Sequence, residues 1–191
     1  MLTISMALGA VYGYLRGGSL TGLAAQPWRL VWLAGVAFAL QVLVVWGVAA
    51  HWSREVGALL LIASYLLLGV VIVANRRLPG MLAVGLGVLM NFLVIAANGG
   101  YMPIAPEALA AQGQHALAAA ETGTHVAGSK DAVVEREQTR LWFLSDVITT
   151  PGIPFWQRSF SVGDVVLAVG LFWLVQGGMR RTAIPRTCEL T

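Results

Sequence analysis

The sequence predicts an all-α integral membrane protein, a bundle of five transmembrane helices with a cap of short helices on the outer face. Of the 191 residues, 58% are hydrophobic and only 11% are charged, whereas soluble chains average about 25% charged residues. The apolar residues gather in five runs, and a polar stretch separates the fourth run from the fifth. We therefore divide the chain into four membrane spans (1–97), an outer-face cap (98–160), and a fifth span with a cytoplasmic tail (161–191).

The first apolar run, Met1 to Leu15, is short against the about 20 residues that a helix needs to cross a membrane. No basic residue precedes it, so we do not expect a signal peptide. Gly9, Gly13 and Gly17 recur at every fourth position. They either form a seam for close helix packing or are simply tolerated in a lipid-exposed helix.

The other apolar runs are bounded by residues that start or stop helices. They are Leu30 to Ala50, Val56 to Ala74, Met81 to Ala97 and Val162 to Val175. Ser53 is a suitable N-cap for the third run, and the segment Asn75-Arg-Arg-Leu-Pro-Gly80 stops that run and starts the next. Gln41 lies in the middle of the second run and should face protein, because an unpaired amide is costly in lipid.

Basic residues set the expected orientation. When five spans are drawn, seven arginines fall on one side with a single acidic residue, Glu189; they are Arg16, Arg29, Arg76, Arg77, Arg180, Arg181 and Arg186. Basic loops stay in the cytoplasm, so the N-terminus is expected outside, the C-terminus inside, and the cap on the outer face of a bacterial cytoplasmic membrane. The arginines form no basic stripe with interleaved aromatics, which argues against nucleic acid as a partner. The lipid bilayer and other membrane-protein subunits are the expected partners.

The outer segment is too long for a plain connection. Its stretch from Pro106 to Glu121 is rich in alanine and compatible with a helix that begins at proline. Thr122 to Ser129 contains two glycines and is expected to be a mobile break. Asp131 to Ser145 carries apolar residues at near-helical spacing, which predicts a further short helix.

Two asparagines mark the exit of the fourth span. Asn91 and Asn98 are seven residues apart, so they lie about two helical turns apart on one face. Asn91 either makes an interhelical hydrogen bond or belongs to a site. Asn98-Gly99-Gly100 either ends the helix with a left-handed residue or presents backbone N–H groups to a ligand. These four residues are our candidates for ligand or partner binding.

Asp146 and Asp164 are the candidate catalytic residues. Both are expected at the outer interface, with one turn-rich connection between them. Two carboxyl groups that meet in a poorly solvated site share a proton, as in aspartyl hydrolases. The alternative for Asp164 is structural, because Ser161-Val-Gly-Asp164 matches a capping box, and the alternative for Asp146 is a turn residue after Ser145. Ligand or ion binding by the pair is a third interpretation.

No motif predicts a cofactor or a metal site. His115 and His125 are ten residues apart, without a nearby cysteine or a second histidine four residues away. The single cysteine, Cys188, excludes an internal disulfide.

Several short motifs together resemble a known family. They are Arg16-Gly-Gly, the linker Asn75-Arg-Arg-Leu-Pro-Gly, Asn91, Asn98-Gly-Gly-Tyr-Met-Pro103, Thr139-Arg-Leu-Trp-Phe-Leu-Ser-Asp146 and Ser161-Val-Gly-Asp164. With these motifs, nearly the whole chain is similar to a family of small bacterial multi-span membrane proteins that is known only as a domain of unknown function. The resemblance implies no activity.

The chain also resembles, more faintly, the type II (lipoprotein) signal peptidases. Those enzymes have four spans with both ends in the cytoplasm and an aspartate pair that flanks an outer connection into the last span, as Asp146 and Asp164 do. Where that family has Phe-Asn-x-Ala-Asp, this chain has Phe160-Ser-Val-Gly-Asp164, without the asparagine. A long insert also separates Asp146 from the fourth span.

The sequence therefore favours a non-catalytic role as an accessory subunit or binding protein that uses a polar cluster on the outer face. The alternative is a membrane aspartyl peptidase acting at the outer interface. A transporter ranks third because the five runs show no inverted repeat.

Overall fold

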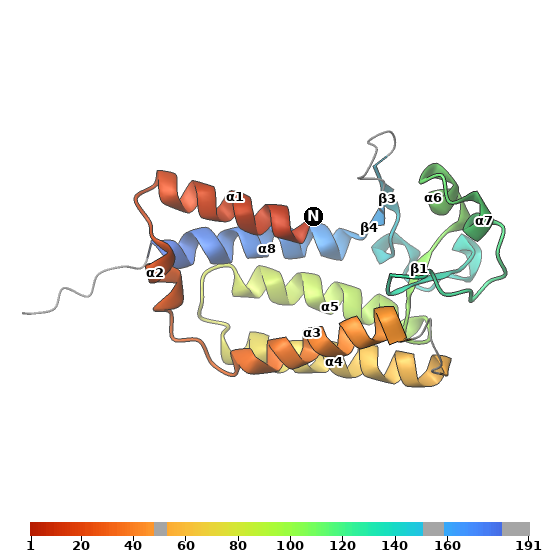
Figure 1. Cartoon of the computed structure of the whole chain (residues 1–191), viewed down its shortest axis with the longest axis horizontal. Helices are drawn as coiled ribbons and strands as arrows, with labels where there is room; N and C mark the ends of the chain where they lie inside the picture. Colours follow the sequence, from red (N-terminus) through yellow and green to blue (C-terminus); the bar gives the residue numbers. More distant parts are fainter. Residues whose placement is uncertain (48–52, 151–158, 181–191) are drawn as a thin grey trace, which may run out of the picture.

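The structure is a computed structural model that describes residues 1–47, 53–150 and 159–180. Long helices lie side by side as a bundle, and a small cap covers one end of it (Figure 1). The bundle helices are α1 (Leu2–Leu15), α3 (Val31–Gly47), α4 (Arg54–Ala74), α5 (Met81–Ala97) and α8 (Val162–Met179). The short helix α2 (Leu20–Ala24) lies at the end away from the cap.

Two of these helices, α4 and α8, are long and apolar enough to cross a membrane, judged by length and composition. In each of them only 33% of the apolar window is buried inside the protein. The helices α1, α3 and α5 are also apolar but shorter, with 14, 17 and 17 residues. The structure thus confirms a mostly helical fold and identifies two candidate membrane spans among the residues that it describes.

Helix α8 lies between α1 and α5 and packs along both (Figure 1). Its contact with α5 is close because glycine recurs at every seventh position of α8, at Gly163, Gly170 and Gly177. The facing helix contributes Gly87, where an added Cβ would lie 2.6 Å from both the carbonyl oxygen of Gly163 and the backbone nitrogen of Leu167. Small residues at such a seam let two helix backbones approach and gain dispersion energy.

The glycines of α1 form a second seam on α8. A Cβ added to Gly9 would lie 2.8 Å from the carbonyl oxygen of Phe172, and one added to Gly13 would lie 2.7 Å from the sulfur of Met179. Gly17 differs from the expected repeat, since it has a positive φ of 76° after the end of the helix and nothing within 4 Å. The packing alternative is therefore observed at Gly9 and Gly13 and not at Gly17.

At the ends of two helices, an asparagine side chain forms hydrogen bonds with the backbone of a connecting segment that is distant in the sequence. At the end of α4, Asn75 accepts from the backbone N–H of Arg29 (2.9 Å) and donates to its carbonyl oxygen (2.7 Å). At the end of α5, Asn98 makes the same pair of hydrogen bonds with the backbone of Arg140, both at 2.9 Å. The leucine after each arginine is left-handed, with φ of 53° at Leu30 and 55° at Leu141. Such a conformation costs about 1–3 kcal/mol for a residue other than glycine, and the paired hydrogen bonds offset this cost.

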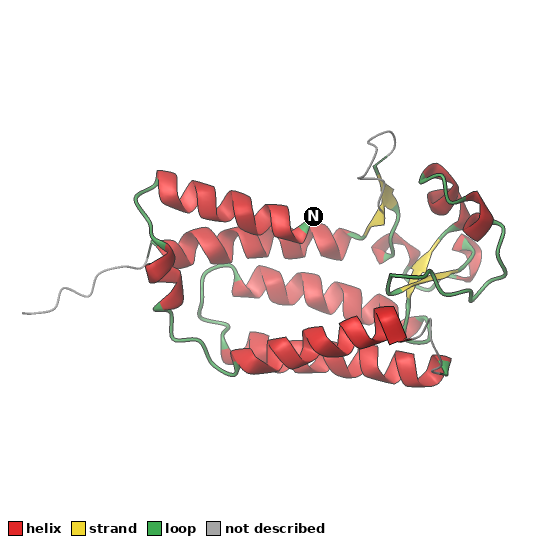
Figure 2. Ribbon diagram, viewed as in Figure 1, coloured by secondary structure: helices red, strands yellow, loops and turns green. Residues whose placement is uncertain are grey.

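The cap contains short strands as well as short helices (Figure 2). Its elements are β1 (Met102–Ile104), α6 (Pro106–Ala111), α7 (His115–Ala118), β2 (Asp131–Val133), the 3₁₀ turns η1 (Arg136–Gln138) and η2 (Trp142–Leu144), β3 (Ile148–Thr149) and β4 (Ser159–Phe160). Strand β1 pairs in parallel with β2, and β3 pairs antiparallel with β4. The prediction of a purely helical cap is therefore wrong.

The residues predicted to form a helix after Asp131 form a strand and two 3₁₀ turns instead. Val133 pairs with Ile104 of β1, and both side chains are buried against Leu109 of α6. The preceding segment, expected to be a mobile break, is tied to β2 by backbone hydrogen bonds such as Gly123 N–H to the carbonyl oxygen of Val133 (2.7 Å). Long-range pairing and apolar burial thus override the weak helical spacing of the sequence.

The α5–α8 seam predicts a contrast between two glycines in helices. Gly87→Ala should lower the free energy of unfolding, because its methyl group meets the backbone of α8; overpacking of this kind costs about 1–3 kcal/mol. Gly69→Ala in α4 is the matched control, since nothing lies within 4 Å of its added Cβ, and alanine there should stabilise the helix by roughly 0.5–1 kcal/mol. Unfolding of the purified protein in detergent measures both. Equal effects of the two substitutions would contradict the close approach.

Candidate functional site

Three polar side chains meet where α8 begins. The hydroxyl oxygen of Ser161 accepts from the backbone N–H of Asp164 (2.9 Å), and the Asp164 carboxylate accepts from the backbone N–H of Ser161 (3.2 Å), which is the capping box that the sequence suggested. Asn91 of α5 donates to Oδ1 of Asp164 (2.8 Å) and accepts from the Ser161 hydroxyl (2.8 Å). Asn91 and Ser161 are 2% and 0% exposed. Asn91 therefore makes an interhelical hydrogen bond, and Asp164 caps its own helix.

Asp146 reaches the same end of the bundle from the cap. It follows η2, and its backbone N–H donates to the carbonyl oxygen of Pro103 in β1 (3.4 Å). The Asp146 side chain is 4% exposed, and its Oδ2 lies 3.7 Å from Nζ of Lys130. The same Nζ lies 3.8 Å from Oδ1 of Asp131. One lysine thus forms ion pairs with two carboxylates, at distances longer than a hydrogen bond.

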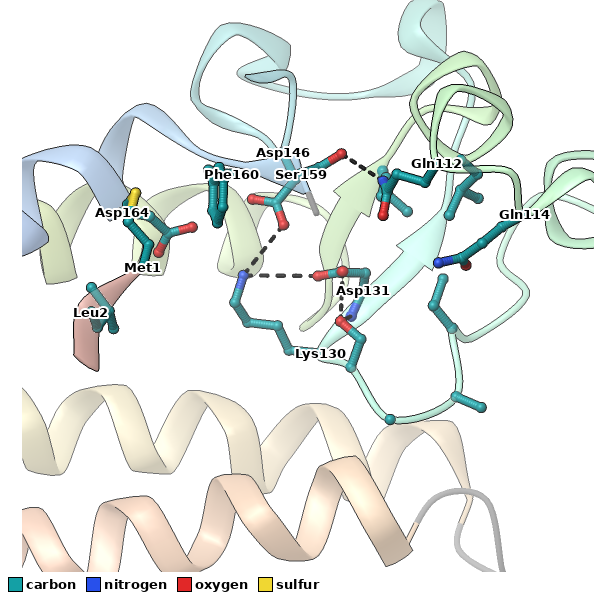
Figure 3. A pocket seen from close by; sticks show the side chains of 16 residues that line it. Met1, Leu2, Gln112, Gln114, Lys130, Asp131, Asp146, Ser159, Phe160 and Asp164 are labelled. Atoms are coloured by element: carbon teal, nitrogen blue, oxygen red, sulfur yellow. Dashed lines mark hydrogen bonds and ion pairs between the residues drawn. The ribbon is translucent and has the colours of Figure 1, made fainter. Parts of the chain in front are cut away.

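These groups line a pocket of about 590 Å³ beneath the cap (Figure 3). The polar side chains of its wall include those of Gln112, Gln114, Lys130, Asp131, Asp146 and Asp164. Apolar side chains complete the wall, among them those of Ile104, Leu109, Val126 and Phe160. The two candidate catalytic aspartates therefore line one pocket. Each is held by other partners, and no hydrogen bond joins their carboxyl groups within the described ranges.

Burial dominates the electrostatics of Asp146. It raises the pKa of the Asp146 carboxyl group to about 8, and the attraction of Lys130 opposes this increase only in part. Burial also works against the charge of Lys130, but Asp146 and Asp131 outweigh it and raise the Lys130 pKa above its usual value. Oδ1 of Asp146 is buried and accepts no hydrogen bond from the residues that the structure describes. The pocket thus holds a charged lysine and a carboxyl group that titrates close to neutral pH.

The other candidate binding residues lie at the exit of α5 and are absent from the wall of this pocket. Asn98 is engaged by the backbone of Arg140, as described above. Gly99 has a positive φ of 79°, and the N–H of Gly100 donates to the carbonyl oxygen of Ile95 (2.8 Å), which together form a Schellman helix stop. The structure therefore gives this segment a structural role, and a role in binding stays a prediction.

The other polar residues that the sequence analysis singled out do not gather at one site in the part of the chain that the structure describes. Gln41 donates to the hydroxyl of Ser64 in α4 (3.1 Å), so it faces protein as expected. His125 packs edge-on against Tyr101 with ring centroids 5.4 Å apart, and His115 is exposed on α7. Among the described residues, no three histidine, cysteine or acidic side chains are close enough together to hold a metal ion. Cys188 lies outside the described residues.

Sequence reasoning missed Lys130 and Asp131 as members of the site. The available signal was composition: Lys130 is the only lysine among twelve basic residues, and it stands beside an acid in the middle of the polar segment. Gln112 was also missed; its amide donates to the Ser159 hydroxyl (2.8 Å) and so links α6 to β4 at the pocket. No local pattern in the sequence indicates that contact.

Together, the fold and the pocket define a mostly helical protein that has apolar helices of membrane-spanning length and a buried acidic cluster under a small cap. The chain belongs to the family of unknown function DUF5317, whose sequence profile matches residues 27–176. This match confirms the resemblance to a family without an assigned activity, and it includes Asn91 and all the charged residues of the pocket. No curated protein and no solved structure matches the chain.

The hydrogen bonds of Asn91 predict a measurable coupling with Ser161. Asn91→Leu and Ser161→Ala should each destabilise the protein, and the double variant should lose less than the sum, with a coupling of roughly 0.6–1.7 kcal/mol. Unfolding in detergent provides the four free energies of the cycle. Asn91→Leu combined with Ser19→Ala, which removes the N-cap of α2 at the far end, is the control and should be additive. Full additivity in the first cycle would contradict the interhelical bond.

The pKa of Asp146 predicts how stability changes with pH. Because the folded-state pKa is about 8, against an ordinary value of 3.8 for an aspartate, the protonated form contributes stability that is complete below about pH 4 and is lost as the pH rises through about 8. Asp146→Asn cannot titrate. Between pH 5 and pH 9, the wild type should therefore lose stability relative to this variant. The difference in melting temperature, variant minus wild type, should increase by the equivalent of at least about 1.4 kcal/mol in free energy of unfolding, which corresponds to one pKa unit. Glu121→Gln, at an exposed position of the cap, should show a constant difference, and a constant difference for Asp146→Asn would refute the raised pKa.

Proposed function

We propose that this protein is a multi-span protein of a bacterial cytoplasmic membrane that binds a small ligand in the pocket under its cap, at the outer face. The observation that carries the proposal is Asp146, a carboxyl group that is 4% exposed and lines the pocket with one oxygen lacking a hydrogen bond from the described residues. Burying such a group is costly unless a partner satisfies it. The pocket, at about 590 Å³, lies within the usual range of about 300–1,000 Å³ for ligand sites.

Exposed apolar side chains support a membrane location. On α4, Leu59, Leu66 and Val73 are 67%, 57% and 60% exposed, and Phe38 on α3 and Trp173 on α8 are 68% and 55% exposed. In water, continuous apolar surfaces of this size favour association, whereas lipid solvates them. The same outward-facing pattern on α1 and α5 supports five spans, including the three helices that are shorter than the hydrocarbon layer. A shorter helix is accommodated by thinning the bilayer at a modest cost.

The charges at the two ends of the bundle support the orientation. Arg16, Arg29, Arg76, Arg77 and Arg180 belong to helix ends and connections opposite the cap (Figure 1). Arg181 and Arg186 lie outside the described residues. Because basic residues are retained in the cytoplasm, the arginine end would be inside and the pocket would open outside. As an accessory subunit, the protein would present its bound ligand to other membrane proteins.

An aspartyl peptidase is the second candidate, because Asp146 and Asp164 line the same pocket. Such an enzyme needs both carboxyl groups on one water molecule. Asp164 would have to leave the amide of Asn91 and the backbone of Ser161, which are its partners in this structure. The geometry therefore supports binding better than peptide hydrolysis.

A cysteine at the rim of the pocket tests the proposal. In a Cys188→Ser background, Ala127→Cys lies at an exposed position that lines the pocket. In intact cells, a membrane-impermeant maleimide should label Ala127→Cys at once, and should label the exposed Arg77→Cys only after the membrane is permeabilised. The reverse order would overturn the orientation.

The same label reports on occupancy. Ala127→Cys should react with the maleimide more slowly in native membranes than after detergent extraction and dialysis, because a bound ligand shields the rim of the pocket. Adding a small-molecule extract of the same cells to the dialysed protein should slow the reaction again. Ala119→Cys, which is exposed on the cap but does not line the pocket, is the control and should react at one rate throughout. Equal rates for Ala127→Cys in membranes and after dialysis would overturn the binding function.

A further inference from the structure

The charges in the pocket do not balance. Among the residues that the structure describes, the lining carries three carboxyl groups, those of Asp131, Asp146 and Asp164, against one basic side chain, Lys130, and the amino group of Met1. With every one of these groups ionised, the described lining still has a net negative charge. Buried charges are stable only when paired, so the lining favours a cation.

The three carboxyl groups are not equally available to a ligand. Asp164 is engaged by Asn91 and by the capping box. Asp131 accepts from the Ser129 hydroxyl through Oδ2 (2.5 Å), and its Oδ1, which has no hydrogen-bond donor in the described part of the chain, is the oxygen paired with Nζ of Lys130 (3.8 Å). Asp146 is the most deeply buried of the three. Its ion pair with Lys130 uses Oδ2, so its Oδ1 has neither this partner nor a hydrogen bond from the described residues. Oδ1 of Asp146 is therefore the acceptor that a cationic donor would use.

Lys130 lies beside Asp146 in the pocket but does not pair with Oδ1 of that carboxyl group. Its Nζ lies on the side of the other Asp146 oxygen, Oδ2, at 3.7 Å, and is shared with Asp131 at 3.8 Å (Figure 3). A second ammonium group that donates to Oδ1 would complete the pairing of Asp146. It would also be repelled by Lys130, so this lysine limits the affinity of the site for cations.

The rest of the lining indicates what the cation carries. Leu109, Val126 and Phe160 form an apolar part of the wall, which suits a hydrocarbon group attached to the charge. A bare metal ion fits less well, because calcium and magnesium require about six or more oxygen ligands, and the described residues include no group of three acidic or histidine side chains with that proximity.

We propose that the pocket binds a small organic amine in its protonated form, with the ammonium group donating to Oδ1 of Asp146 and the hydrocarbon part lying against Leu109, Val126 and Phe160. This inference rests on the proposed binding function and specifies the chemical class of the ligand. Lys130 acts as an internal competitor that sets the affinity.

The test compares three probes of similar shape and different charge on the full-length protein in detergent. Phenethylamine is the cation, 2-phenylethanol the neutral analogue and 3-phenylpropionate the anion, with calcium chloride as the metal arm. Isothermal titration calorimetry measures binding, and Ala127→Trp, which places bulk at the pocket rim, provides the baseline for partition into micelles. Phenethylamine alone should bind the wild type above this baseline. Equal or stronger binding of the alcohol, the carboxylate or calcium would overturn the inference.

Two substitutions locate the binding. At pH 9, above the Asp146 pKa of about 8, Asp146→Asn should lower the affinity for phenethylamine at least about tenfold, because an opposite charge at this range is worth one or more pK units, whereas Glu121→Gln should leave it unchanged. Lys130→Met removes the repelling charge and should raise the affinity, again by about tenfold. Undiminished binding in Asp146→Asn, or weaker binding in Lys130→Met, would refute the assignment. If Asp146→Asn does not fold, the response of Lys130→Met decides alone.

The two proposals fail in different ways. If no probe binds, or only the alcohol or the carboxylate does, while Ala127→Cys is still protected in native membranes, the amine inference falls and the binding function stands. If no probe binds and the labelling shows no protection, both fall.

Discussion

The close approach of α5 and α8 is the constraint on which the rest of the structure depends. Glycines on both helices let the backbones meet, and at the cap end of the seam Asn91 bonds to Ser161 and Asp164. Asn91 is 2% exposed, so these two hydrogen bonds satisfy its buried amide and fix how far each helix extends toward the cap. The start of α8, and with it Asp164 in the wall of the pocket, is placed by this contact.

The cap is positioned by a second set of constraints. The side chain of Asn98 holds the backbone of Arg140 at the end of α5, in the same manner that Asn75 holds Arg29 at the other end of the bundle. The pairing of β1 with β2 then brings Lys130 and Asp131 in front of Asp146. The acidic pocket is thus assembled from segments that are far apart in the chain, each held by backbone hydrogen bonds rather than by the charges themselves. This arrangement leaves the charges imperfectly paired, which adds little to stability and agrees with the proposed binding function.

The features that make Asp146 available to a ligand also lower the stability of the fold. Burial raises the pKa of this carboxyl group, and one of its oxygens is without a hydrogen bond from the described residues, so the group costs folding free energy that an apolar side chain would not. Asp164 has the reverse balance, since its carboxylate accepts hydrogen bonds from Ser161 and Asn91. The two aspartates look equivalent in the sequence but differ in the structure. Asp164 caps the start of α8, whereas Asp146 has an oxygen that is available to a ligand.

Much of the fold follows from the sequence alone, because helix periodicity, glycine and proline stops, and capping residues are local. The apolar runs, the capping box at Ser161 and the helix stop at Gly99 all act within a few residues, and each is present in the structure. Features that depend on contacts between residues distant in the sequence were determined only by the tertiary structure. Val133 joins a strand because Ile104 offers a pairing edge, and Lys130 becomes part of a pocket because Asp146 lies beside it in space. No local pattern encodes these contacts, since their free energy comes from burial and pairing that exist only once the chain is folded.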